Sequence, residues 1–126
     1  MPKQALQPEG RLKPNPPYSP VVVAGDAVYT AGQTGTAADG KLVAGGIAEQ
    51  TRQTLENVRA CVEAAGCTMD DVVKVSAFLA DLSGFAAYND VYREFFAEPY
   101  PARTSVQAGL PAGVLIEIEA IAQRGL

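Results

Sequence analysis

Two neighbouring segments near the end of the sequence carry side chains that could do chemistry. Arg103 and Ser105 lie near the start of one expected strand, and Glu117 and Glu119 lie on the next. These four side chains share one face of a sheet if Arg103 faces Glu119 and Ser105 faces Glu117, and a shift of one residue separates them. The alternative is a structural Arg–Glu pair across two strands. The pattern alone leaves both interpretations open.

The composition removes several common mechanisms. The chain has no histidine, which excludes Ser-His-Asp and Cys-His nucleophiles and histidine-ligated zinc. Cys61 and Cys67 are too few for a disulfide scaffold, and their spacing matches no metal pattern. We therefore expect reduced thiols and no metal or other cofactor.

Length and charge limit the class of protein. The 126 residues predict a single domain, residues 1–126, with 48% hydrophobic and 19% charged residues. A net charge of −4 is the wrong sign for neutralising phosphates, so we expect no nucleic-acid partner. The sequence contains no apolar run near the roughly 18 residues of a spanning helix, and its start does not resemble a signal peptide. We expect no membrane contact and a cytoplasmic location.

The first half of the chain predicts an arm, a hairpin, a loop and a helix. Residues 1–20 contain six prolines, which favour an extended arm over a helix or a central strand. Val21 to Ala24 and Ala27 to Ala31 predict a hairpin around Gly25-Asp26. Glycine-rich residues 32–46 predict a loop. From Ile47 a helical apolar period runs to Gly66, a typical helix terminator.

The second half predicts strand, helix, strand and strand. The expected strands are about 72–80, 103–108 and 114–122. Between the first and the second of them we expect a helix that Ser83 caps and that the prolines after residue 98 end. The order β-β-α-β-α-β-β predicts an α+β fold with two helices on one face of a mixed sheet. Along 114–122 one face is apolar and the other mixes acidic with apolar residues, which favours an interface between subunits.

Seven segments follow one another along the chain: PPYSP, AGQTG, TRQTLENVRACVEAAG, DDVVKVSAFLADLSGF, YNDVYREFF, PARTSV and LPAGVLIEIEAIA. In their order and spacing they resemble the RidA/YjgF family of small enamine and imine deaminases. The resemblance covers about residues 17–123. It implies a chorismate-mutase-like subunit, a homotrimer and sites between subunits.

The reaction that the resemblance implies is hydrolysis of reactive 2-imino acids, the tautomers of 2-aminoacrylate and 2-aminocrotonate, to 2-oxo acids and ammonia. Such an imine already hydrolyses in water, so the protein needs only to hold the carboxylate and place a water. By resemblance, Arg103 grips the carboxylate, and its planar fork suits this better than a lysine. Glu117 positions or activates the water, with Glu119 as the alternative on the same strand face.

The resemblance assigns four further residues to substrate binding. Tyr18 closes the pocket, Gly32 turns its backbone amide to the ligand, and Asn89 lies nearby. Two of these residues have a structural alternative: Tyr18 could pack the proline arm, and Asn89 could bind a loop backbone. Ser105 stands where many members have cysteine, and Pro17 to Pro20 replace the more common GPYSQ, which alters the pocket entrance.

Three other functions stay open at this point. A non-catalytic binder of small carboxylates would share every residue named above. RNA cleavage, with which the family has been linked, has little support in a chain with this charge and no histidine. A chorismate-mutase-type rearrangement would suit an arginine-lined cleft, but the resemblance supplies only one arginine.

The absence of metal-ligand patterns generates a first prediction. Incubation with EDTA, followed by its removal, should leave any turnover of imines unchanged, because no residue set at metal-binding spacing is visible. A loss of activity that zinc or manganese restored would show that a ligand set was missed.

Overall fold

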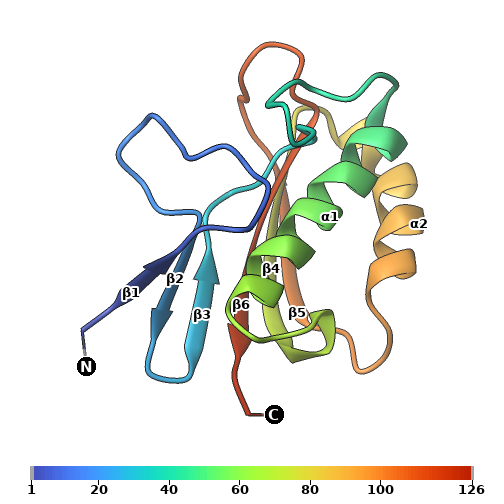
Figure 1. The fold of residues 1–126 in the computed structure, drawn as a ribbon. Coiled ribbons are helices and arrows are strands. Elements are labelled where there is room, and N and C mark those ends of the chain that lie inside the picture. The colour runs from blue at the N-terminus through green and yellow to red at the C-terminus, as the bar shows by residue number, and fades with distance from the viewer. Residues whose placement is uncertain (1, 126) are drawn as a thin grey trace.

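The computed structural model describes residues 2–125 and contains a six-stranded mixed sheet with two helices against one face (Figure 1). The strand order is β1-β2-β3-β6-β4-β5. The elements are β1 (Gln4–Leu6), β2 (Val21–Ala24), β3 (Ala27–Thr30), α1 (Ile47–Ala64), β4 (Val72–Leu79), α2 (Phe85–Phe95), β5 (Ala102–Gln107) and β6 (Ile116–Gln123). The α+β fold expected from the sequence is confirmed. Within the described residues, neither helix is long and apolar enough to cross a membrane.

The hairpin and the first helix lie where the sequence predicts them. β2 and β3 pair antiparallel around Gly25. Its φ of +60° is a backbone conformation that suits a tight turn and that residues other than glycine rarely adopt. α1 is followed by Gly66 in the left-handed conformation, with φ of +82°, and the Gly66 amide donates to the Glu63 carbonyl. These local signals mark the turn of the hairpin and the end of the helix.

Part of the N-terminal arm forms a strand that the sequence analysis did not predict. β1 pairs antiparallel with β2 at the edge of the sheet. The prolines at positions 2 and 8 lie outside Gln4–Leu6, so the amides of this short segment remain available for pairing. The high proline count therefore hid a three-residue edge strand.

The last two strands are not neighbours, which overturns one expectation. β5 pairs parallel with β4, and β6 pairs antiparallel with β4 on its other side. The connection from β5 to β6 passes across the end of β4. On one side the Ala108 amide donates to the Leu79 carbonyl, and on the other the Ala80 amide donates to the Leu115 carbonyl. The sequence left two arrangements open, Arg103 facing Glu119 with Ser105 facing Glu117, or a structural Arg–Glu pair across the two strands. Both require β5 beside β6, so neither forms within residues 2–125.

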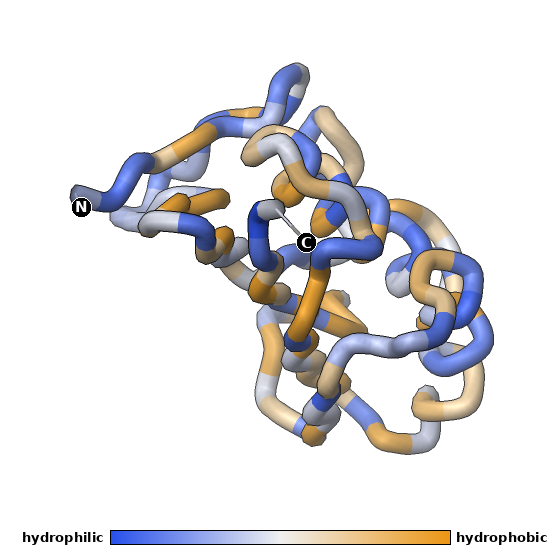
Figure 2. The backbone as a smooth tube through the Cα atoms, turned by 90° about the horizontal axis from the view of Figure 1, so that it is seen from below, coloured by the Kyte–Doolittle hydropathy of each residue, from blue (hydrophilic) through white to orange (hydrophobic). Residues whose placement is uncertain are grey.

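β6 has the two-faced pattern that the sequence predicts. Ile116, Ile118, Ala120 and Ala122 are buried in the core against the helices. The intervening residues lie on the face that no helix covers, where Glu119 is exposed and Ile121 half-buried. Figure 2 shows hydrophobic and hydrophilic residues following one another along the chain toward its C-terminus. The uncovered face also carries Tyr29, which is paired with Ile121 and 44% exposed.

The uncovered sheet face generates a prediction about assembly. Light scattering should give three times the mass of one chain, because a monomer would leave the Tyr29 and Ile121 surface in water. Ile121→Lys should shift the protein toward smaller species, since the new charge would be desolvated in the interface. Ala64→Lys is the matched control, because Ala64 is exposed on α1 in the other layer. A monodisperse wild-type monomer would contradict the prediction.

Candidate active site

Arg103 is held on β5 by residues of α2. It is aligned with Val75 on the helix-covered face of the sheet. Its Nη1 donates a 2.8 Å hydrogen bond to Oδ1 of Asn89. Three rings of α2 surround the guanidinium: the distances from Cζ to the ring centroids are 4.7 Å for Tyr92, 5.0 Å for Tyr88 and 5.6 Å for Phe85. These residues, together with Ser105, form the Arg103 cluster.

The Arg103 cluster leaves the positive charge without an internal counterion. Three ion pairs form within residues 2–125, and none includes Arg103. Cation–π contacts favour the charged side chain by roughly 0.5 to 2 kcal/mol each, depending on desolvation. A guanidinium carries five N–H donors, and the bond to Asn89 uses one of them. The remaining fork is available for a carboxylate.

Ser105 on β5 contacts α2 through a hydrogen bond. It is aligned with Ala77 on the same face as Arg103, and its Oγ lies 3.0 Å from the hydroxyl of Tyr88. Tyr88 is fully buried, and burial raises the pKa of its phenol, which stays neutral. The Tyr88–Ser105 hydrogen bond joins β5 to α2 beside Arg103. Ser105 is therefore a positioning residue within this subunit.

α2 starts one residue later than predicted and has a different cap. Ser83 lies in a short 3-10 turn, Leu82–Gly84, and Gly84 precedes the helix without a side-chain cap. The Asp81 carboxylate accepts a 2.8 Å hydrogen bond from the Ser83 amide and so caps this turn. The predicted Ser83 cap is wrong: Gly84 takes the N-cap position of α2, and Ser83 lies inside the turn that Asp81 caps.

A cavity of about 230 Å³ opens beside the guanidinium. Its lining residues are Asn89, Tyr92, Arg93, Tyr100, Pro101 and Arg103. The Tyr92 hydroxyl is buried and has no hydrogen-bond partner within residues 2–125. Burial raises the pKa of Tyr92, so the hydroxyl is a neutral group that can donate. The cavity therefore presents a charged fork, and a buried hydroxyl without a partner belongs to one of its lining residues.

Glu117 lies on the opposite face of the sheet, against Gly32. A Cβ added to Gly32 would lie 2.9 Å from Cδ and 3.0 Å from Cγ of Glu117, too close for any real side chain. The backbone is fixed here, because Gln33 and Ile118 exchange hydrogen bonds of 2.8 and 2.9 Å. Only glycine allows Glu117 this position. Gly32, Glu117 and Glu119 form the Glu117 cluster.

Burial raises the pKa of the Glu117 carboxyl above its ordinary value, and the negative charge of Glu119 raises it further. Glu119 itself is exposed and faces Ser76 across the strands, whereas Glu117 is half-buried. A raised pKa makes Glu117 a stronger base when ionised. The structure thus favours Glu117 over Glu119 as the group that handles a proton.

The expected site residues fall into separate groups within one chain. Arg103, Asn89 and Ser105 lie on the helix-covered face, whereas Gly32 and Glu117 lie on the uncovered face. Tyr18 lies on the N-terminal arm, where its ring is 53% exposed. A single subunit does not bring Arg103 and Glu117 together.

Two structural features of the site were missed from the sequence. The sequence analysis assigned no part of the site to Phe85, Tyr88 and Tyr92, which lie at helical spacing and cage Arg103. The spacing of these rings together with Asn89 was the available signal. Gln50 was not singled out; its side-chain amide donates to the Gly113 carbonyl and accepts from the Leu115 amide, both at 2.9 Å. It fixes the turn that leads into β6.

Comparisons with known proteins relate almost the whole chain to one family. The family model described as Endoribonuclease L-PSP matches residues 8–124. A RutC family protein of Pyrococcus horikoshii is 46% identical over 124 residues, which is 97% of this chain and 98% of the relative. A 2-iminobutanoate/2-iminopropanoate deaminase of Bos taurus is 45% identical over 111 residues, covering 86% of this chain and 81% of the relative.

Two solved structures have the same fold. RidA from a Psychrobacter species superposes with a TM-score of 0.89 at 40% identity, covering 95% of this chain and 98% of that one. E. coli TdcF, solved with bound serine, gives a TM-score of 0.88 at 39% identity, covering 96% and 98%.

The coupling of the two carboxylates generates a prediction about pH. If Glu117 acts as a base, activity falls as the pH drops through its raised pKa, because protonation removes the base. Glu119→Gln removes the neighbouring negative charge, lowers the pKa of Glu117 and should move the acid limb of the kcat/KM profile to lower pH. Glu63→Gln, an exposed change on α1, should leave the limb in place. A shift toward higher pH in Glu119→Gln would contradict the assignment.

Proposed function

Because the chain belongs to the RidA/YjgF family, the family described as Endoribonuclease L-PSP, we propose that it hydrolyses small 2-imino acids to 2-oxo acids and ammonia. Relatives named as deaminases support imine deaminase activity at the level of the family. The RutC family relatives carry no reaction in their names. The observation that carries the proposal is the caged Arg103 fork, which has no internal counterion in the part of the chain that the structure describes.

The proposed reaction uses positioning and proton transfer. Arg103 holds the substrate carboxylate in a bidentate pair, and Asn89 and the rings of α2 fix the guanidinium. The ionised Glu117 accepts a proton from water as the water oxygen bonds to the C=N carbon, and passes this proton to the imine nitrogen, which gives a tetrahedral adduct with a hydroxyl and an amino group. Glu117 then takes the hydroxyl proton as the carbonyl forms and delivers it to the departing nitrogen, which leaves as ammonia. Imine and water give oxo acid and ammonia, without a covalent enzyme intermediate.

The proposal requires more than one copy of the chain. Arg103 and Glu117 lie on opposite faces of one sheet, so both can reach one substrate only if they come from different subunits. We propose a homotrimer in which the Arg103 cluster of one subunit meets the Glu117 cluster of the next. β5 is an edge strand, which leaves the Arg103 cluster near a side that another copy can approach. Tyr18 then closes the cleft.

A non-catalytic role in binding small carboxylates is the second candidate. The structure of E. coli TdcF with bound serine shows that a relative holds an amino acid, which carries a carboxylate. The same Arg103 fork would serve such a role here. RNA cleavage, which the family description suggests, is less favoured because the chain has a net charge of −4 and no histidine. We also propose a single domain, no cofactor and a cytoplasmic setting.

The decisive experiment generates imines in situ. A threonine or serine dehydratase supplies the unstable imine, and the appearance of 2-oxo acid is measured with and without this protein. Arg103→Ala should lower kcat/KM by about 30-fold or more, because losing one partner of a desolvated charge pair costs roughly 2 to 5 kcal/mol. Arg103→Lys should also be poor, since one ammonium cannot reproduce the fork.

Arg59→Ala is a matched control. Arg59 also lies over an aromatic ring, with its Cζ 4.7 Å from the centroid of Phe95, but it is far from Arg103 in the sequence. It should retain wild-type turnover. Full activity of Arg103→Ala would refute the carboxylate clamp. If the wild-type protein bound 2-oxobutanoate through Arg103 yet did not accelerate hydrolysis, the non-catalytic alternative would hold.

A further inference from the structure

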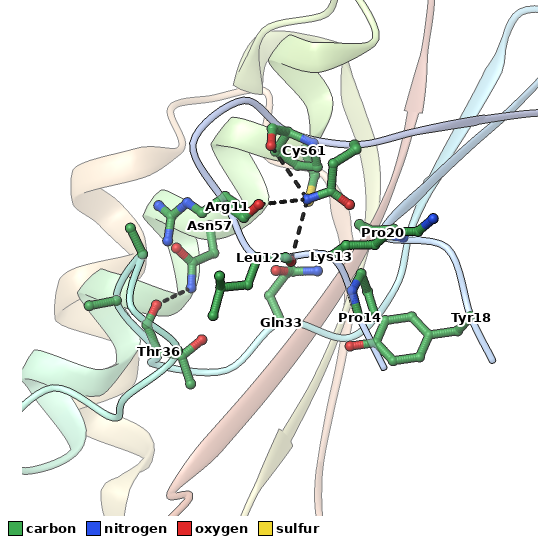
Figure 3. Close-up of a pocket in the computed structure, with 15 residues that line it drawn as sticks. Arg11, Leu12, Lys13, Pro14, Tyr18, Pro20, Gln33, Thr36, Asn57 and Cys61 are labelled. Carbon is green, nitrogen blue, oxygen red and sulfur yellow. Dashed lines mark hydrogen bonds between the residues drawn. The ribbon is translucent and has the colours of Figure 1, made fainter. Parts of the chain in front are cut away.

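A second cavity, of about 190 Å³, lies between the N-terminal arm, the loop after β3 and α1 (Figure 3). We call it the arm cavity. None of Arg103, Glu117 and Gly32 lines it, so it is separate from both clusters described above. Tyr18 and Gln33 form one of its walls.

The arm wall of this cavity is held by one side chain. Nε2 of Gln7 donates to the carbonyl oxygens of Arg11 at 3.2 Å and of Leu12 and Pro8 at 3.4 Å (Figure 3). The Arg11 amide also closes a turn onto the Pro8 carbonyl. The arm is therefore a formed loop that presents Arg11 at a defined place.

The helix wall is fixed in the same way. Nδ2 of Asn57, which is 4% exposed on α1, donates to the carbonyl oxygens of Thr34 at 2.9 Å and Thr36 at 2.8 Å. Its Oδ1 accepts from Gln53 at 2.9 Å. Figure 3 shows the Arg11 side chain extended toward Asn57 and the Thr36 segment. The amide of Asn57 is thus occupied by the protein itself and does not compete with the Arg11 guanidinium for a ligand.

The charge of the arm cavity has one sign. Arg11 and Lys13 line it, and no aspartate or glutamate does, although the chain as a whole has a net charge of −4. Within residues 2–125, neither cation takes part in an ion pair. The thiol of Cys61 lies at the buried helix side, and burial raises its pKa to about 11, so it stays neutral. The local potential therefore favours an anion.

The remaining wall is largely apolar. Leu12 is 66% exposed at the rim, and Pro14, Tyr18 and Ala37 also line the space. A cavity of about 190 Å³ has the volume of roughly six waters, at about 30 Å³ each in the liquid. A fully hydrated inorganic anion would leave these apolar surfaces unpaired. A short organic acid matches both the cation and the apolar wall.

We propose that the arm cavity is a second binding site, which takes a small aliphatic carboxylate through Arg11 and packs its hydrocarbon part against Leu12 and Pro14. This site is distinct from the one proposed at Arg103. Its occupant would contact Tyr18 and Gln33, the neighbour of Gly32.

Calorimetric titration of the full chain tests the proposal, with butanoate and inorganic phosphate as probes. The titrations use the Arg103→Ala variant, which removes the carboxylate clamp proposed above. If the function proposed for Arg103 is wrong, this substitution should not affect binding in the arm cavity. Butanoate should bind, and phosphate should bind about tenfold more weakly or less. Adding Arg11→Gln should weaken butanoate about tenfold or more, through loss of a charge-assisted hydrogen bond. Lys3→Gln, the same charge change on the same arm outside the cavity, should leave the affinity within about twofold.

Three results would overturn the proposal: no butanoate binding in the Arg103→Ala background, unchanged binding after Arg11→Gln, or phosphate binding as tight as butanoate. Leu12→Asp is an independent variant at an exposed position, so it should fold. Its negative charge at the rim should weaken butanoate as well, and unchanged affinity there would also count against the site.

Discussion

The alternation of side chains along β5 and β6 decides where every candidate site residue lies. Successive residues of a strand point to opposite faces, and the two helices cover only one face of this sheet. Arg103 shares its row with buried Val75, whereas Glu117 shares its row with Phe78 on the uncovered face. No side-chain rotation carries either group through the sheet. A reaction that needs both Arg103 and Glu117 must therefore be shared between copies of the chain. A contact between subunits on the half-apolar face of β6 would then help to form the site as well as bury apolar surface.

The environment of Arg103 shows how one helix face serves two purposes. The rings of Tyr88 and Tyr92 pack edge to face, with centroids 5.8 Å apart, and both belong to the core between α2 and the sheet. The same rings present their faces to the guanidinium, which lies in the half-buried margin of that core. A carboxylate partner from the same chain would stabilise Arg103 more but would occupy its fork. Asn89 fixes the orientation while leaving the charge unbalanced.

The sequence predicted what short-range signals determine and missed what long-range pairing determines. The hairpin, α1 and the alternation of β6 follow from turn glycines and apolar periods within a few residues. The sheet order does not, because the Leu110 to Gly113 segment is compatible with a hairpin as well as with a crossover past β4. Residue types at the site could be identified by resemblance, but their distribution over two faces depends on that order. The Asp81 cap shows the same limit at short range. Asp81 and Ser83 are both residue types that cap helical turns, and the sequence alone does not decide between them.

The chain has no histidine, and the geometry explains why the proposed chemistry does not need one. An imine carbon is already electrophilic, so catalysis requires an ionised base of adequate strength and a fixed substrate. Burial against Gly32 and repulsion from Glu119 strengthen Glu117 as a base, because both raise its pKa. A second subunit placed on this face would exclude more water and raise that pKa further. In the proposed trimer, Arg103 of another copy would oppose this effect through its charge, which a bound substrate carboxylate would neutralise, so the base would retain its strength when the cleft is occupied.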